Sequence, residues 1–248
     1  MQCRYIRNNY SKILLILINY YKIQIYKINI NFEENDKNKN NENKLQIFNK
    51  KYKTELTLEL NALELSKKSI DDEGFKLLSE IPFHQINTIN LSNNSISDLT
   101  PLLKMNLDNL TQLNLCKNRI DNIEIFIKLN LSHLTILNLG GNRLKDFKVL
   151  EKVNLNSLNE LLLFKNKISD INNLEYLNCP NLRKINLTEN FIEDITVFER
   201  IKFPQLNEVY FACNYFDHEV IKNNDIISNL RKRGCYVGIY GTIIQKFC

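Results

Sequence analysis

The stretch TQLNLCKNRIDNI (111–123) decides the fold, because the chain repeats its pattern at a fixed spacing. Its apolar residues Leu113 and Leu115, with Leu110 before them, form a trio that recurs every 24 residues from Ile86 onward. The trios are Ile86/Ile89/Leu91, Leu110/Leu113/Leu115, Leu134/Leu137/Leu139, Leu158/Leu161/Leu163, Leu182/Ile185/Leu187 and Leu206/Val209/Phe211. A longer copy at Leu60/Leu63/Leu65 lies 26 residues before Ile86, so the chain contains seven units. A fixed period of this length is the signature of a repeat architecture.

The second half of each unit is equally regular. An asparagine recurs at positions 94, 118, 142, 166, 190 and 214, and an apolar residue follows it two positions later. We expect this asparagine column to stack its amides along the array and to satisfy backbone groups in the turn after each strand. Asp98, Asp146, Asp170 and Asp194 stand just before further apolar columns. A carboxylate there can cap the first N–H groups of a short helix.

The pattern L-x-x-L-x-L-x-x-N-x-I resembles the leucine-rich repeat, and the resemblance covers residues 60–216. It implies an α/β repeat fold: a right-handed solenoid with a parallel β-sheet on the concave face and short helices on the convex face. The phrase NNSISDLTPL (93–102) is also similar to the short repeats of internalin-type surface proteins and of phosphatase-regulating subunits, which repeat at a shorter period.

Three segments are expected along the chain. Residues 1–55 are rich in Asn and Lys and predict a largely disordered segment, with the polar stretch 33–54 as a linker. Residues 56–216 form the solenoid, and 217–248 form a C-terminal cap in which 218–233 is a helix and 235–240 one more strand. The apolar run ILLILI (13–18) resembles the start of a signal peptide but is too short to span a bilayer.

Charge and cysteine spacing restrict the partners and the compartment. Residues 1–55 hold 11 Lys/Arg and 5 Asp/Glu, whereas the rest of the chain holds 22 and 23. A nearly neutral folded part argues against a general nucleic-acid partner. The six cysteines are widely spaced and contain no C-x-x-C pair. We therefore predict reduced thiols in an intracellular monomer, cytoplasmic or nuclear, with secretion or anchoring as the alternative.

No motif with catalytic chemistry was found. Glycine-rich phosphate loops, H-E-x-x-H and G-x-S-x-G are absent from the sequence. Each of the three histidines shares its repeat position with ordinary polar residues. The prediction is a non-enzymatic chain without a metal or cofactor.

The candidate binding site lies on the face that the strands turn away from the core. The copy NELLLFKNKISDI (159–171) has Leu162 where its siblings have Asn, and Phe164 where they have Cys or Thr. With Ile136 and Tyr210 these side chains would form an exposed apolar patch, and such patches often mark interaction sites. The predicted partner-binding residues are Ile136, Glu160, Leu162, Phe164, Lys184, Glu208 and Tyr210. The resemblance implies a protein partner on this concave face, and the alternative is chance drift of surface residues.

A second candidate surface flanks the asparagine column. In three successive copies, basic residues occupy five of the six positions beside the asparagine: Lys117, Arg119, Arg143, Lys165 and Lys167. This basic rim could bind RNA, phosphates or an acidic partner. A solvated charged edge without a partner is the simpler interpretation.

Overall fold

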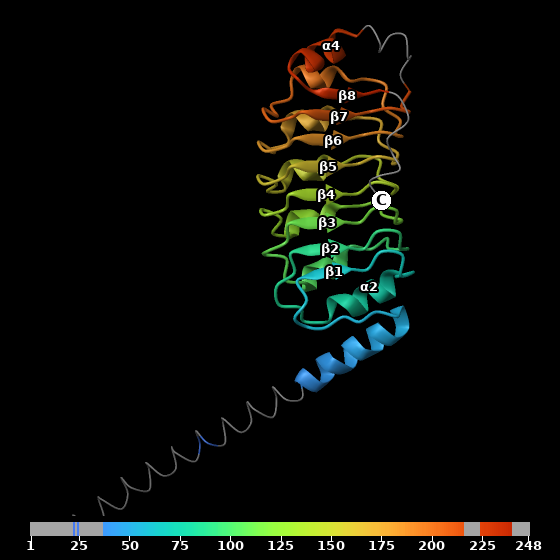
Figure 1. Cartoon of the computed structure of the whole chain (residues 1–248), viewed down its shortest axis with the longest axis vertical. Helices are drawn as coiled ribbons and strands as arrows, with labels where there is room; N and C mark the ends of the chain where they lie inside the picture. Colours follow the sequence, from blue (N-terminus) through green and yellow to red (C-terminus); the bar gives the residue numbers. More distant parts are fainter. Residues whose placement is uncertain (1–21, 23, 25–36, 216–223, 240–248) are drawn as a thin grey trace, which may run out of the picture. The chain divides into compact units, whose positions relative to one another are not determined.

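The computed structural model describes residues 22, 24, 37–215 and 224–239. The chain divides into two compact units, 1–46 and 47–248, and the second contains all the repeats (Figure 1). The apolar run 13–18 lies outside the described residues. Within the part of the chain that the structure describes, no helix has both the length and the apolar character needed to cross a membrane.

Eight short strands form one parallel sheet, in the order in which they follow along the chain. They are β1 Ala62–Glu64, β2 Thr88–Asn90, β3 Gln112–Asn114, β4 Ile136–Asn138, β5 Glu160–Leu162, β6 Lys184–Asn186, β7 Glu208–Tyr210 and β8 Tyr236–Gly238. Leu113 pairs in register with Ile89 on one side and Leu137 on the other. Because successive side chains of a strand point to opposite faces, this middle residue is buried while its two neighbours face away from the core. The parallel sheet that the leucine-rich repeat resemblance implied is confirmed.

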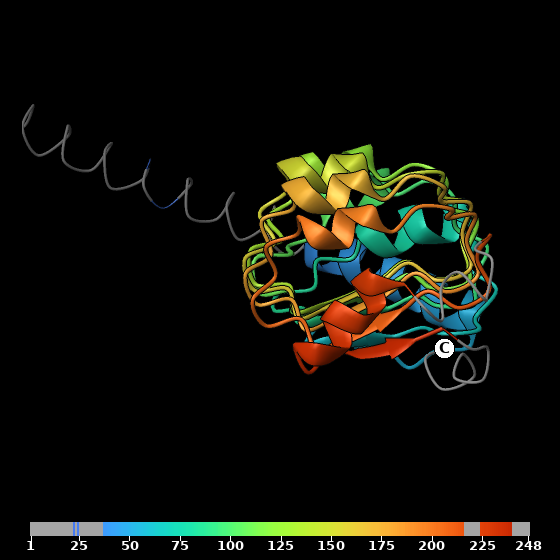
Figure 2. The same ribbon diagram turned by 90° about the horizontal axis from the view of Figure 1, so that it is seen from above.

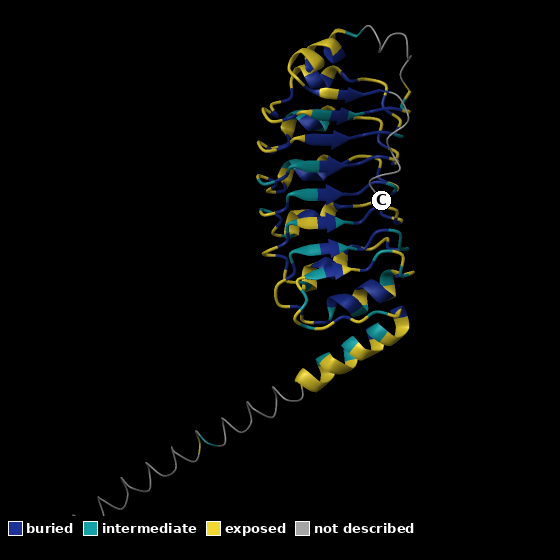
Figure 3. Ribbon diagram, viewed as in Figure 1, coloured by how far each residue is buried: buried dark blue, intermediate teal, exposed yellow. Residues whose placement is uncertain are grey.

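Short helices lie opposite the sheet, as the view along the array shows (Figure 2). They are the α-helix α2 (Asp72–Ser79) and the 3-10 helices η1 Thr100–Lys104, η2 Glu124–Lys128, η3 Lys148–Lys152, η4 Asn172–Tyr176 and η5 Thr196–Glu199. Each η helix buries at least one apolar residue, and Leu102, Phe126 and Leu174 are fully buried, whereas Leu103 and Ile127 on the same helices remain exposed. The core therefore lies between the sheet and the helices, and exposed residues concentrate in the connections (Figure 3).

The predicted capping carboxylates act at the start of the convex helices. Asp98 Oδ1 accepts the backbone N–H of Thr100 at 2.8 Å, and Asp194 Oδ1 accepts that of Thr196 at 2.7 Å. Asp72, which aligns with Asp98, does not cap its own helix: Asp71 caps α2 by accepting from Gly74 N at 2.9 Å. Asp72 instead accepts N–H bonds from the next repeat.

Asp72 links the first repeat to the second. Its Oδ1 accepts from Ser97 N at 2.7 Å and from Asp98 N at 2.9 Å. Burial opposes ionisation of this carboxyl group, but the hydrogen bonds from Ser97 and Asp98 and the charge of Arg119 outweigh it and lower its pKa.

The asparagine column forms a continuous ladder. Asn142 donates its amide N–H groups to the carbonyl oxygens of Leu115 and Leu139, both at 3.0 Å. Its Oδ1 accepts from Ile120 N at 3.0 Å, and the side chain is almost fully buried. Asn118, Asn166 and Asn190 make the equivalent bonds in their own repeats. Each amide thus joins two successive turns of the solenoid, as the column predicted.

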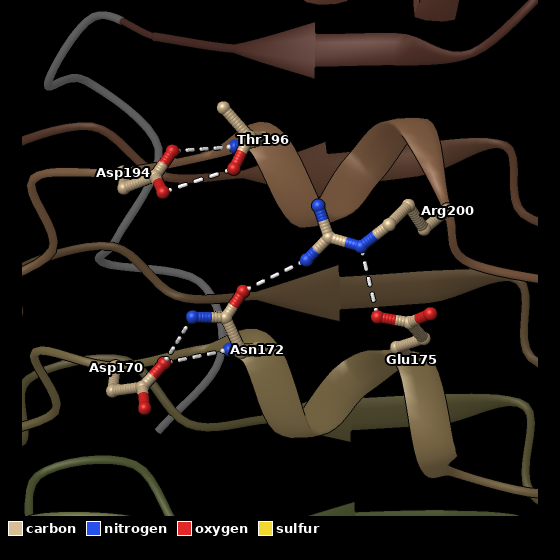
Figure 4. A network of polar contacts seen from close by, with 6 residues as sticks. All are labelled: Asp170, Asn172, Glu175, Asp194, Thr196 and Arg200. Carbon is tan, nitrogen blue, oxygen red and sulfur yellow. Dashed lines mark hydrogen bonds and ion pairs between the residues drawn. The ribbon is translucent and has the colours of Figure 1, made fainter.

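Polar side chains also connect the last two convex helices (Figure 4). Arg200 donates from Nε to Glu175 Oε2 at 2.8 Å and from Nη2 to Asn172 Oδ1 at 3.0 Å. Asp170 in turn orients Asn172, because Asp170 Oδ1 accepts the backbone N–H of Asn172 at 2.8 Å. This network lies on the surface, since Arg200 and Glu175 both remain partly exposed.

The prediction of a disordered linker is wrong for residues 37–52, which are helical, with the boundary between the two units inside this stretch. The local composition is polar, but Phe48 and Tyr52 are buried, with ring centroids 4.7 Å apart. Asn49 closes this end of the chain by accepting from Leu56 N and donating to Leu56 O, both at 2.9 Å. The composition suggested that this segment could not offset the entropy cost of ordering. Burial of the two rings and the hydrogen bonds between Asn49 and Leu56 do offset it.

The C-terminal cap has the expected order of helix and strand. The described helix, α4, covers Asp225–Lys232, a shorter range than the predicted 218–233, because Asn224 caps it by accepting from Ile226 N at 2.8 Å. Residues 216–223 lie outside the described residues. Strand β8 pairs with β7, with Val237 opposite Val209.

Candidate partner-binding surface

Each repeat contributes three residues to the concave face. Two of them flank the buried middle residue of the strand, and the third lies two positions after the last residue of the strand. In the first four strands this face is hollow. A depression of about 190 Å³ is lined by Glu64, Asn90, Gln112, Asn114 and Ile136, with Leu162 at its far end. Ile136, one of the predicted binding residues, is half-buried in it.

Leu162 and Phe164 were expected to be exposed, and this part of the prediction is wrong. Leu162 is 3% exposed and Phe164 1%, and the two form a small apolar cluster with Cys116. The phenyl ring lies over Gly140 of the preceding repeat, where an added Cβ would overlap it. Both side chains leave the strand on the concave side, as the alternation requires, but they pack against that surface instead of projecting from it.

The charged members of the predicted site come together on β5, β6 and β7. Lys184 Nζ lies 3.5 Å from Glu208 Oε2 and 3.9 Å from Glu160 Oε2. The lysine is largely buried, whereas the two carboxylates keep about a third of their side-chain surface exposed. Tyr210 donates its hydroxyl hydrogen to Glu208 Oε2 at 2.9 Å, and Lys184 Nζ lies 5.7 Å from its ring centroid. Burial and the bond to Glu208 raise the pKa of Tyr210.

Sequence reasoning missed one member of this surface. Tyr236 at the start of β8 is 51% exposed, and its ring centroid lies 5.5 Å from that of Tyr210. Tyr210 also covers Gly238, where an added Cβ would lie 2.6 Å from its Cδ1. The signal was present in CYVGIY, which was identified as a strand but not aligned with the concave columns. We call Glu160, Lys184, Glu208, Tyr210 and Tyr236 the acidic–aromatic patch.

The five residues of the basic rim are exposed. Lys117 and Lys165 occupy equivalent turn positions, with φ of 53° and 54°, directly before the buried asparagine of their turns. Lys165 Nζ lies 3.6 Å from Glu189 Oε2, a surface ion pair. The structure therefore brings the rim together at one edge of the sheet, apart from the acidic–aromatic patch.

Of the six cysteines predicted to be reduced thiols, Cys3 and Cys248 lie outside the described residues. Cys179, Cys213 and Cys235 are free, and burial raises the pKa of Cys179 to about 12, so that thiol is inert at neutral pH. Cys116 is disulfide-bonded, contrary to the prediction. Among the described residues no three His, Cys, Asp or Glu side chains gather as metal ligands.

Comparison with solved structures agrees with this architecture. A complex of TLR13 with ssRNA13 superimposes with a TM-score of 0.52 at 23% identity, over 73% of this chain and 25% of that one. The chain folds as a leucine-rich repeat solenoid.

Two proteins from Listeria monocytogenes str. 4b F2365 are also similar to this chain. Internalin C2 is 23% identical over 72% of this chain and 80% of its own, with a TM-score of 0.49. Internalin InlF is 20% identical over 82% and 68%, also with a TM-score of 0.49. No protein-family model and no curated protein matches the sequence. At these identities the likeness concerns the fold alone.

Proposed function

We propose that the protein is a non-enzymatic interaction module that binds a partner protein on its concave face. The observation that supports it is the acidic–aromatic patch, in which Lys184 is held between Glu160 and Glu208. Fixing side chains before a partner arrives lowers the entropy cost of binding, and tyrosine is favoured at interface hot spots.

The patch also indicates the chemistry of the partner. Two carboxylates face one ammonium group, so the patch has a net charge of about −1, and two half-exposed tyrosine rings border it. A surface with a protruding Arg or Lys beside an apolar residue would be complementary, because the cation can pair with Glu208 and rest on Tyr236. The neighbouring hollow around Ile136 gives room for a side chain of that partner.

Leu162 and Phe164 take a different part in this proposal from the one the sequence suggested. They support the concave surface from within, because their burial leaves little area for direct contact with a partner. The predicted site therefore keeps Ile136, Glu160, Lys184, Glu208 and Tyr210 as contact residues. Intracellular location and a monomeric state remain predictions.

Affinity capture from the source cell tests the proposal. Wild type is compared with Glu208→Lys/Tyr236→Ala, and with the matched control Glu199→Lys/Tyr176→Ala, which makes the same changes at exposed convex positions. We expect the concave variant to lose partners that the control retains. Equal recovery of the same partners by all three proteins would contradict binding at this patch.

A further inference from the structure

One column of side chains at the edge of the sheet changes character along the solenoid. After Ser95 in the second repeat, the residues that follow the asparagine ladder by one position are Arg119, Arg143, Lys167, Phe191 and Tyr215. We call them the edge column. Its first three members belong to the basic rim, and its last two, which sequence reasoning did not connect with the rim, are aromatic.

The backbone keeps this column in register. Arg143 N donates to Ile120 O at 2.8 Å, Lys167 N to Leu144 O at 2.8 Å, and Phe191 N to Ile168 O at 2.8 Å. The same bond recurs at Arg119 and Tyr215. Each side chain therefore leaves the solenoid from an equivalent point, one strand spacing of about 4.8 Å after the last.

The two aromatic rings form an exposed stack. The centroids of Phe191 and Tyr215 lie 5.3 Å apart, with the ring planes only 5° from parallel. Phe191 is 42% exposed and Tyr215 63%, although each covers one face of the other. Exposed aromatic side chains of this size are uncommon in the described part of this chain, and here two of them lie together in the open.

Positive charge is concentrated in the three turns that precede that stack, whereas the turn of Phe191 itself carries Glu189 and Glu193 and no Lys or Arg. The three turn segments 117–121, 141–145 and 165–169 carry six Lys/Arg and one carboxylate, Asp121. Lys165 is partly neutralised by Glu189 in the next turn, so the excess lies toward Arg119 and Arg143. The near neutrality of residues 56–248, which argued against a nucleic-acid partner, therefore conceals a local basic surface.

We propose that the edge column binds a single-stranded nucleic acid, with phosphates along Arg119, Arg143 and Lys167 and a base stacked on the Phe191–Tyr215 pair. Proteins that bind single strands combine a basic track with aromatic platforms, because phosphates are anionic and every base has a flat face. From Arg119 to Tyr215 the column spans four strand spacings, roughly 19 Å, which a short oligonucleotide can follow. An acidic peptide would also match the cations, but its Asp and Glu side chains carry no ring, whereas every nucleotide carries both a phosphate and a flat base.

The test measures fluorescence anisotropy of labelled 12-nucleotide oligo(U) and oligo(dT) against the full chain. We expect dissociation constants in the micromolar range at physiological salt, and log K falling with log salt at a slope of about −2 to −3.5 for three to five neutralised phosphates. Comparison of the two oligonucleotides distinguishes RNA from DNA as the natural ligand. A 12-residue polyglutamate peptide serves as the acidic-peptide probe.

Two matched pairs of variants distinguish binding at the edge column from nonspecific effects of removing positive charge or an exposed aromatic ring. Arg119→Ala/Arg143→Ala/Lys167→Ala should weaken oligonucleotide binding at least tenfold and reduce the salt slope by about 2. Its control, Lys128→Ala/Lys148→Ala/Lys152→Ala, removes the same charge from exposed convex positions and should leave both unchanged. Tyr215→Ala should weaken binding about 5- to 100-fold, whereas Tyr176→Ala, whose side chain is 64% exposed, should not.

Three outcomes would overturn the proposal. One is no saturable binding of either oligonucleotide. Another is equal weakening of binding by the two triple variants, which would show that binding depends on net charge and not on the edge column. The third is polyglutamate binding as tight as oligonucleotide binding with no effect of Tyr215→Ala, which would assign the column to an acidic protein segment. Thermal unfolding of each variant, with Tyr215→Leu as a second substitution, checks that the fold is retained.

Discussion

The ring of Phe164 lies over Gly140, one repeat earlier on the concave face, in space that any side chain at position 140 would fill. The two residues are 24 positions apart in the sequence and adjacent in the sheet, as the pairing of β4 with β5 requires. The glycine explains how a large aromatic ring can be buried on a face that its neighbours leave partly open.

Gly140→Val should therefore destabilise the protein through a clash with Phe164. Overpacking of a filled site costs about 1–3 kcal/mol, measured as the change in unfolding free energy in urea. In the Phe164→Ala background the same substitution should cost much less, because the ring is gone. If Gly140→Val costs the same in both backgrounds, the two residues are not coupled.

Asn142→Ala should be among the most damaging single changes in the solenoid. It removes the partner of Ile120 N, Leu115 O and Leu139 O, and a buried group left without a hydrogen bond costs about 1–3 kcal/mol. We expect a loss of at least about 2 kcal/mol in unfolding free energy. Asn109→Ala, at an exposed loop position, is the control and should change stability by less than about 0.5 kcal/mol.

Asp71 should give the protein an acid-sensitive stability. The hydrogen bond from Gly74 N lowers the pKa of this carboxyl group below its usual 3.8. A lowered folded-state pKa means that the stabilisation is present above pH 3.8 and is lost as the pH falls through the folded-state value. Unfolding free energies from pH 7 to pH 2 should show this loss in wild type and a smaller one in Asp71→Asn, which keeps a capping oxygen without the charge. Parallel curves for the two proteins would contradict the assignment.

Arg200→Ala should have little effect despite the network that this side chain joins (Figure 4). Its partners Glu175 and Asn172 are at the surface, and exposed ion pairs contribute about 0.2–1 kcal/mol. Thermal unfolding at low and high salt should give nearly the same difference from wild type. A loss above about 2 kcal/mol would show that the network stabilises the convex face far more than its exposure suggests.

Lys184→Met should weaken the acidic–aromatic patch, since it leaves Glu160 and Glu208 without the cation between them. We expect lower stability, because the two carboxylates then lack a compensating charge, and a smaller loss at high salt, which screens their repulsion. Urea unfolding at low and high salt measures both. Glu160→Gln added to the variant should recover part of the loss, and no recovery would argue against the repulsion.

The sequence by itself determined the solenoid. A 24-residue period with apolar residues at fixed positions indicates equivalent turns that bury their core by stacking, so strand register and the asparagine ladder followed from the spacing. The polar composition of residues 37–52 wrongly predicted disorder, because the burial of Phe48 and Tyr52 and the hydrogen bonds of Asn49 stabilise this segment.

Only the tertiary structure decided what the concave face and its edge present. Alternation fixed the side on which Leu162 and Phe164 emerge, but their exposure depends on neighbours one repeat away, such as Gly140. Likewise, Phe191 and Tyr215 become a platform in line with Arg119 and Arg143 only when successive turns stack. Direction is a local property of the backbone, whereas burial and assembly of a surface depend on residues that the sequence places 24 positions apart.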